Sequence, residues 1–141
     1  MTKKVHLVIK GEQSGFGEKD TSEIVTTADY YLKGGKHYLF YSEYTEERQI
    51  WKNRLTIDHD HVELKKTGPG NSQLLFREGQ SEKCFYQSPV GPMELVSDTK
   101  KIQFHCEKDS LKLTLIYSLY MNGMLMSDYH LTVKANSIIG E

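Results

Sequence analysis

The sequence predicts an all-β protein, a single antiparallel up-and-down β-barrel of about 8–10 strands that occupies one domain, residues 1–141. Three observations lead to this prediction. Apolar and polar residues alternate along most of the chain, turn-forming residues recur about every 8–14 positions, and no segment carries a convincing helical period. A two-sheet sandwich shares this spacing, but closure into a barrel removes the strand edges that a long meander leaves exposed.

The N-terminal part of the chain predicts one strand, a loop and a hairpin. Apolar residues occupy alternate positions of residues 4–10, which form the first predicted strand. The glycine-containing residues 11–17 predict a polar loop, without the Gly-Lys-Ser/Thr sequence that a phosphate cradle requires. Residues 22–44 predict a hairpin that turns at Gly34-Gly35.

The register of this hairpin places a carboxylate on an apolar face. A two-glycine loop pairs Tyr30 with Leu39. Continued alternation then gives two further pairs, Ala28 with Tyr41 and Thr26 with Glu43. Glu43 therefore shares its side of the sheet with Tyr30 and Tyr41, and we expect it to point into the barrel.

A second hairpin is predicted over residues 50–67. Thr45 to Gln49 form a turn, although Thr45 is also a possible cap for a short helix. The alternation of apolar residues after residue 50 favours the strand, and Asp58-His59-Asp60-His61 provides the next turn. That turn pairs Asn53 with Lys66, on the same face as Glu43.

Residues 68–106 predict shorter strands. Gly68-Pro69-Gly70 ends the preceding strand. Short strands follow around residues 74–76 and 84–88. A longer extended stretch covers residues 93–104, and we expect Asp98-Thr99 to bend it.

The clearest signal is a hairpin over residues 110–136, with Asn122-Gly123 in its turn. A two-residue loop pairs Met121 with Met124, but it sets Leu115 opposite His130 and so splits both apolar faces. A three-residue loop keeps the faces together by pairing Tyr120 with Met124. We expect the three-residue loop, with Leu113 opposite Leu131 and Leu115 opposite Tyr129.

Composition excludes several kinds of partner. The 18 basic and 19 acidic residues nearly cancel and form no basic block, so we expect binding neither to nucleic acid nor to membranes. No apolar run approaches the roughly 20 residues of a membrane helix, and the N-terminus lacks a signal-peptide core. We expect a cytoplasmic protein in which Cys84 and Cys106 are unbonded, small, buried side chains; a redox pair is the alternative.

The candidate site consists of inward-facing polar residues. Glu43, Asn53 and Lys66 face the interior of neighbouring strands, where an isolated charge is costly and the two charges therefore need each other or water. We expect tyrosines to line the same interior: Tyr30, Tyr41, Tyr117 and Tyr129. A purely structural ion pair, or charges that reach solvent at the strand ends, are the alternatives.

Other polar groups do not predict a site. His59 and His61 have a spacing that can place two metal ligands together, but in a turn we expect them to be solvated, and we expect no metal. No serine lies in a Gly-x-Ser-x-Gly elbow. The sequence indicates no cofactor.

Several short motifs resemble those of a known family. They are Tyr41-Ser42-Glu43, Lys66-Thr67-Gly68, Phe76-Arg77-Glu78-Gly79, Tyr86-Gln87-Ser88-Pro89-Val90-Gly91, Asp98-Thr99 and residues 117–123. In this order and spacing, the chain resembles the YwiB-like proteins, small uncharacterised bacterial proteins with a lipocalin-like (calycin) barrel. The resemblance implies that fold and a bacterial cytoplasmic origin, without an activity. Two residues differ from the family pattern: Lys66 replaces Arg, and so cannot form a bidentate fork, and Ser88 replaces Thr.

These observations support three hypotheses on function. The first is a barrel that binds a small apolar or amphiphilic molecule in its interior. The second is a filled barrel that acts as a structural or interaction protein, either monomeric or homodimeric. The third, ranked last, is an enzyme that uses Glu43 and Lys66 for proton transfer. This ranking rests largely on analogy with the fold.

Overall fold

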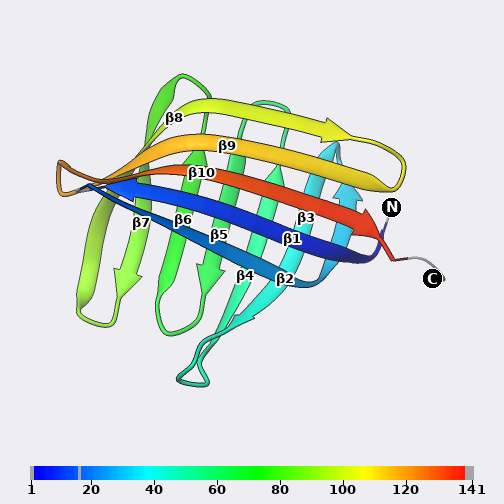
Figure 1. The fold of residues 1–141 in the computed structure, drawn as a ribbon, viewed down its shortest axis with the longest axis horizontal. Helices are drawn as coiled ribbons and strands as arrows, with labels where there is room; N and C mark the ends of the chain where they lie inside the picture. Colours follow the sequence, from blue (N-terminus) through cyan, green and yellow to red (C-terminus); the bar gives the residue numbers. More distant parts are fainter. Residues whose placement is uncertain (1, 16, 139–141) are drawn as a thin grey trace.

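The computed structural model describes residues 2–15 and 17–138 as one closed antiparallel barrel of ten strands (Figure 1). Each strand pairs with its neighbours in the chain, and the first pairs with the last. The strands are β1 (Thr2–Gly15), β2 (Glu18–Lys33), β3 (Lys36–Tyr44), β4 (Ile50–Ile57), β5 (Val62–Thr67), β6 (Asn71–Phe76), β7 (Gln80–Ser88), β8 (Gly91–Cys106), β9 (Ser110–Met121) and β10 (Met124–Ser137). The predicted all-β barrel is confirmed. In the part of the chain described, no helix is long and apolar enough to cross a membrane.

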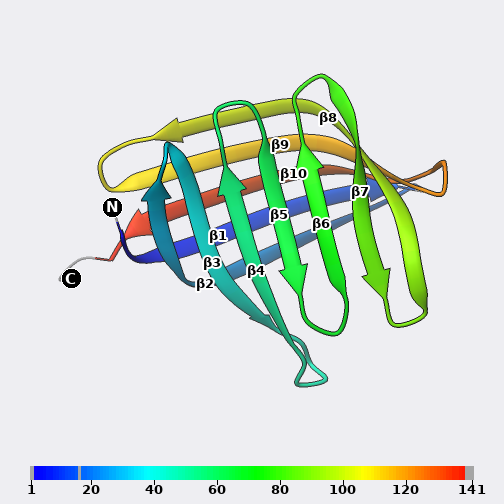
Figure 2. The same cartoon turned by 180° about the vertical axis from the view of Figure 1, so that it is seen from behind.

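The barrel has two sets of strands that cross at a steep angle. Figures 1 and 2 show β8, β9, β10, β1 and β2 lying side by side as one layer, with β3 to β7 running across them. The first set is long, with 16 residues in β2 and in β8, whereas β5 and β6 have six each. The β8–β9 register shifts between Thr99 and Lys101, directly after the residues predicted to bend this strand.

The predicted polar loop at residues 11–17 is wrong. β1 continues to Gly15 and pairs with β2, for example Gly11 with Ser22. A Cβ atom on Gly11 would lie 2.9 Å from the Ser22 Oγ, and one on Gly15 would lie 2.8 Å from the carbonyl oxygen of Met126. These glycines therefore mark close approaches between neighbouring strands.

The predicted register of the β9–β10 hairpin is also wrong. Asn122 and Gly123 form a two-residue turn with positive φ angles of 51° and 83°, and Met121 pairs with Met124. A bulge between Leu125 and Ser127 then inserts one residue. Beyond the bulge, Leu115 meets Leu131 and Leu113 meets Val133, so the apolar faces stay together. The bulge resolves the conflict that had favoured the three-residue loop.

The β4–β5 register is confirmed, with Asn53 opposite Lys66. In the β2–β3 hairpin, Tyr30 pairs with Leu39 as predicted, but the pairing ends at Asp29 and Phe40. The expected pairs of Ala28 with Tyr41 and of Thr26 with Glu43 do not form. The N-terminal part of β2 follows β1 instead, and β2 and β3 separate.

A second separation, between β6 and β7, is closed by side chains. Only Asn71 to Gln73 pair with β7. Beyond them, the backbone N–H of Leu75 donates to the Cys84 Sγ at 3.4 Å, and the Ser97 hydroxyl donates to the Leu75 carbonyl oxygen. Cys84 is buried as predicted. Its sulfur also accepts a backbone hydrogen bond that a β7 carbonyl oxygen would accept in a continuous sheet. Cys106 is exposed, contrary to expectation, and both thiols are unbonded.

The hydrophobic core fills one end of the barrel. It joins the N-terminal part of β1, the C-terminal part of β2, the N-terminal part of β3 and the adjoining parts of β4, β5, β6, β9 and β10. Its largest fully buried side chains are Tyr30, Phe76, Leu7, Leu39, Leu55, Ile57, Leu113, Leu115, Val62 and Val133. The inward positions toward the other end of β1 are Ile9, Gly11 and Gln13, which supply less apolar volume.

Candidate functional site

The other end of the barrel contains a cavity of about 430 Å³. Its mouth lies where β2 and β3 separate, because residues of both strands line it from opposite sides. The apolar part of its wall consists of Ile9, Ile24, Leu64, Leu74, Leu119 and Leu131. Tyrosines and charged residues also line it: Tyr41, Tyr117, Tyr129, Glu12, Asp20, Glu43 and Lys66.

The sequence creates this space in two ways. Gly11 occupies an inward position of β1 and contributes no side chain, and Gln13, the next inward residue, is exposed. The separation of β2 from β3 removes a stretch of ladder that would otherwise close the wall. The first feature lies in the segment that the sequence predicted to be a loop, and the second lies within the predicted hairpin over residues 22–44.

Glu43, Asn53 and Lys66 meet as predicted. The Lys66 Nζ lies 2.9 Å from the Glu43 Oε1, and the Asn53 Nδ2 donates to the same oxygen at 2.9 Å. The side chains of Lys66 and Glu43 are 33% and 25% exposed, so the ion pair is half-buried. Asn53 is only 3% exposed, and its Oδ1 has no hydrogen-bond partner among the residues described.

Both bonds to Glu43 end on Oε1. Its Oε2 accepts no hydrogen bond from the described residues, although the side chain lines the cavity. The carboxylate is therefore held in place through one oxygen while the other stays available. Asn53 supports Glu43 but is not part of the cavity wall.

Two tyrosine hydroxyls are also available in the cavity. Tyr41 and Tyr117 are 7% and 6% exposed, and neither hydroxyl hydrogen-bonds to another described residue. Burial raises the pKa of both hydroxyls; the Glu43 carboxylate and Tyr117 raise the pKa of Tyr41 further, and Tyr129 and Cys84 that of Tyr117. Both groups stay protonated at neutral pH, and each can donate and accept one hydrogen bond.

Aromatic contacts fix the position of Tyr117. Its ring stacks on Tyr129 with centroids 5.0 Å apart and planes at 9°, and it packs against Phe76 at 4.5 Å. Because Phe76 belongs to the filled core, these contacts connect the cavity wall to the filled end of the barrel.

Tyr30 lies elsewhere than expected. Its side chain is 1% exposed in the filled end of the barrel, where its hydroxyl shares a hydrogen bond with the His37 Nδ1. The ring of Phe104 contacts His37 edge-on. Tyr30 therefore contributes to the core and is not part of the cavity wall.

Sequence reasoning missed the part of the site that β1 and β2 provide. Glu12 and Gln13 line the cavity mouth but lie in the segment predicted to be a loop, and Asp20 and Thr21 lie before the predicted hairpin, where no element was predicted. The available signal was continued alternation past Ile9, which polar residues and glycine obscured.

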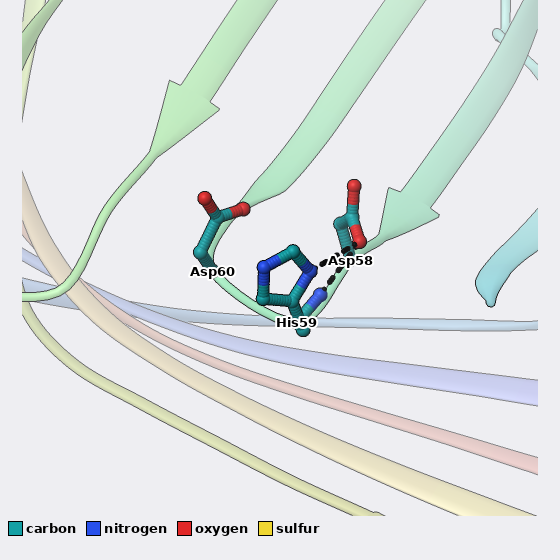
Figure 3. A group of neighbouring side chains, drawn as sticks. All are labelled: Asp58, His59 and Asp60. Carbon is teal, nitrogen blue, oxygen red and sulfur yellow. Dashed lines mark hydrogen bonds and ion pairs between the residues drawn. The ribbon is translucent and has the colours of Figure 1, made fainter.

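A second polar cluster lies in the turn between β4 and β5. Asp58, His59 and Asp60 have potential ligand atoms within 4.8 Å of one another. Figure 3 shows His59 between the two carboxylates, with bonds to Asp58 only: its backbone N–H donates at 2.8 Å and its Nδ1 lies 3.0 Å away. Asp60 pairs with His61 and Arg77.

Each of these carboxylates already has protein partners. Hydrogen bonds from His59 lower the pKa of Asp58, and one from His61 lowers that of Asp60. His59 is 85% exposed at its side chain. These contacts account for the conformation of the turn without an ion.

Comparisons with known proteins agree with the fold. A family model described as "Domain of unknown function (DUF1934)" matches residues 7–133. The "Uncharacterized beta-barrel protein YwiB" of Bacillus subtilis (strain 168) is 23% identical over 129 residues, which cover 92% of this chain and 90% of the relative.

A crystal structure of the ywiB protein from Bacillus subtilis superposes with a TM-score of 0.87 at 22% identity, covering 97% of this chain and 93% of that one. These matches confirm the predicted resemblance and the β-barrel. The finer assignment to lipocalin-like (calycin) barrels stays a prediction.

Proposed function

This chain belongs to the DUF1934 family, which is described as a domain of unknown function, and we propose that it binds one small apolar or amphiphilic molecule in the cavity whose mouth lies between β2 and β3. The observation that carries this proposal is the cavity of about 430 Å³ with unpartnered polar groups in an apolar wall. Binding sites for small molecules typically enclose about 300–1,000 Å³ and combine an apolar lining with a few polar groups.

Two tyrosine hydroxyls support the proposal. The side chains of Tyr41 and Tyr117 are more than nine-tenths buried, but both hydroxyls border the cavity, and neither bonds to another described residue. They can therefore bond to a ligand that enters the cavity. A polar group on the ligand would supply those bonds, while its apolar part would cover the leucine and isoleucine side chains.

A thermal-shift screen of fatty acids, flavins and small amphiphiles tests the proposal. A ligand at a hundredfold excess over its Kd stabilises the folded state by about 2.7 kcal/mol. A Leu131→Trp variant, which fills the cavity, should lose this stabilisation. Leu125→Trp is the matched control on the same strand, because Leu125 is exposed outside the cavity. Stabilisation that is equal in wild type and Leu131→Trp would place binding elsewhere, and a screen without a stabiliser would contradict the proposal.

A second candidate function, as an interaction protein, is favoured by exposed aromatic residues on the outer face of β2 and β3. Tyr31 and Phe40 are each 41% exposed and contact each other edge-on, and Tyr38 stacks near Phe40. Sedimentation velocity of the wild type and of Phe40→Glu tests self-association through this face. A monomer at all concentrations would remove the homodimer from consideration.

A further inference from the structure

The cavity mouth carries an excess of negative charge. Of the ionisable side chains that line it, Glu12, Asp20 and Glu43 are acidic and Lys66 is basic. Lys66 is already 2.9 Å from the Glu43 Oε1. Glu12 has Lys19 at 3.8 Å, but both side chains are more than half exposed, so this pair neutralises little. Asp20 forms no ion pair with any described residue.

These charges discriminate against an anionic ligand. A carboxylate that approached Lys66 would meet the Glu43 carboxylate on the same ammonium group, and it would pass Asp20 and Glu12 to reach it. Like charges repel more strongly in a partly desolvated cavity than in water. Lys66 is therefore a poor receptor for an anion as long as Glu43 is ionised.

A cationic group meets suitable partners in the same place. The Glu43 Oε2 accepts no bond from the described residues, and the oxygens of Tyr41 and Tyr117 can each accept one. The rings of Tyr41, Tyr117 and Tyr129 also line the cavity, and aromatic faces attract ammonium groups. An N–H donor would complete hydrogen bonds that the protein leaves open.

We propose that the ligand of this cavity carries a positively charged nitrogen on an apolar body, and that Glu43, Tyr41 and Tyr117 bind that nitrogen. This inference rests on the proposed function and specifies the class of ligand. Leu64, Leu74 and Leu131 contact the apolar body. Glu12 and Asp20 attract the cation to the mouth, an effect that salt weakens because both side chains are exposed.

Three probes that share an octyl chain test the charge directly: octylammonium, octanoate and 1-octanol, titrated by calorimetry at pH 7 and below micelle-forming concentrations. We expect octylammonium to bind about tenfold more tightly than octanol, because one charged hydrogen bond and one cation–π contact are added. Octanoate should bind more weakly than octanol. Added sodium chloride should reduce the preference for the cation.

Variants separate Glu43 from general electrostatics. Glu43→Gln should weaken octylammonium binding about tenfold and leave octanol binding within about twofold. Asp20→Asn, at an exposed position, should reduce the preference for the cation by a smaller factor. Glu46→Gln, in the turn outside the cavity, is the matched control and should bind all three probes as wild type does.

The outcomes distinguish the two proposals. If octanoate binds best, or if all three probes bind alike, the cavity takes an apolar body but does not select a cation, and this inference is overturned while the proposed function stands. If none of the probes binds at millimolar concentration, both are overturned. A preference for the cation that Glu43→Gln leaves unchanged would overturn the role of Glu43.

Discussion

Removal of the Glu43 carboxylate should destabilise the protein in two separable steps. Glu43→Gln removes the charge but keeps a carbonyl oxygen that can accept from Asn53 and Lys66. Glu43→Ala also removes that acceptor. The ion pair is a quarter to a third exposed, which limits its contribution to about 1 kcal/mol. The bond from Asn53, whose side chain is buried, adds about 1.5–2 kcal/mol.

We therefore expect free energies of unfolding lower by about 1 kcal/mol in Glu43→Gln and by about 2–3 kcal/mol in Glu43→Ala. With a urea m-value of about 2 kcal/mol/M, the alanine variant should unfold at a concentration about 1–1.5 M lower. The fluorescence of Trp51, the single tryptophan, and far-UV circular dichroism provide two independent measurements.

Glu46 supplies the control, because it is exposed in the turn before β4. Its substitution to Gln or Ala should change stability by less than about 0.5 kcal/mol. A double-mutant cycle of Glu43→Gln with Lys66→Met should give a coupling energy near 1 kcal/mol that decreases with salt. Equal unfolding midpoints for Glu43→Ala and Glu46→Ala would refute the view that the cluster contributes to stability.

Three further predictions concern other parts of the barrel. Cys106 should react with a thiol reagent in the folded protein and Cys84 only on unfolding, so two fast-reacting thiols would contradict the burial of Cys84. Burial lowers the pKa of His37, so the unfolded chain binds more protons and the free energy of unfolding should fall as the pH drops below about 6.5. His37→Gln should lose that part of the pH dependence, and identical pH profiles would show that His37 makes no contribution. Deletion of Met126 should remove the bulge and leave the register beyond it unchanged, because Ser127 can still pair with Leu119 when it directly follows Leu125. The variant should therefore fold with Leu115 opposite Leu131, and cross-strand NMR contacts that place another residue opposite Leu115 would contradict this.

Sequence periodicity predicts those elements in which one face is apolar and the turn has a standard length. β4 and β5 satisfy both conditions, and Asn53 lies opposite Lys66 as predicted. Because β3 also alternates, the sequence alone places its Glu43 on the same face. The β4–β5 register and the alternation in β3 together predict that the three polar side chains share one face of the sheet.

The sequence does not reveal where neighbouring strands part. Alternation continues through Ala28 and Tyr41 whether or not those residues pair, because it reports burial of a face and not the partner of the backbone. The bulge at Met126 is similar, since one inserted residue leaves no compositional signal. The separation of β2 from β3 forms the cavity mouth, and the bulge sets the β9–β10 register. The predicted pairing of Ala28 with Tyr41 and the predicted three-residue loop were wrong for these reasons.

The pairing of β1 with β10 has a consequence for synthesis of the protein. β1 ends at Gly15 and β10 begins at Met124. At about 5–20 residues per second, a ribosome needs about 5–20 s to make the intervening roughly 110 residues. Throughout that time the nascent β1–β2 hairpin has an open backbone edge along β1, so the last step of folding must wait for the C-terminal strand. A chain that lost β10 would keep two such edges, on β1 and on β9, and would expose the apolar side chains that now form the core.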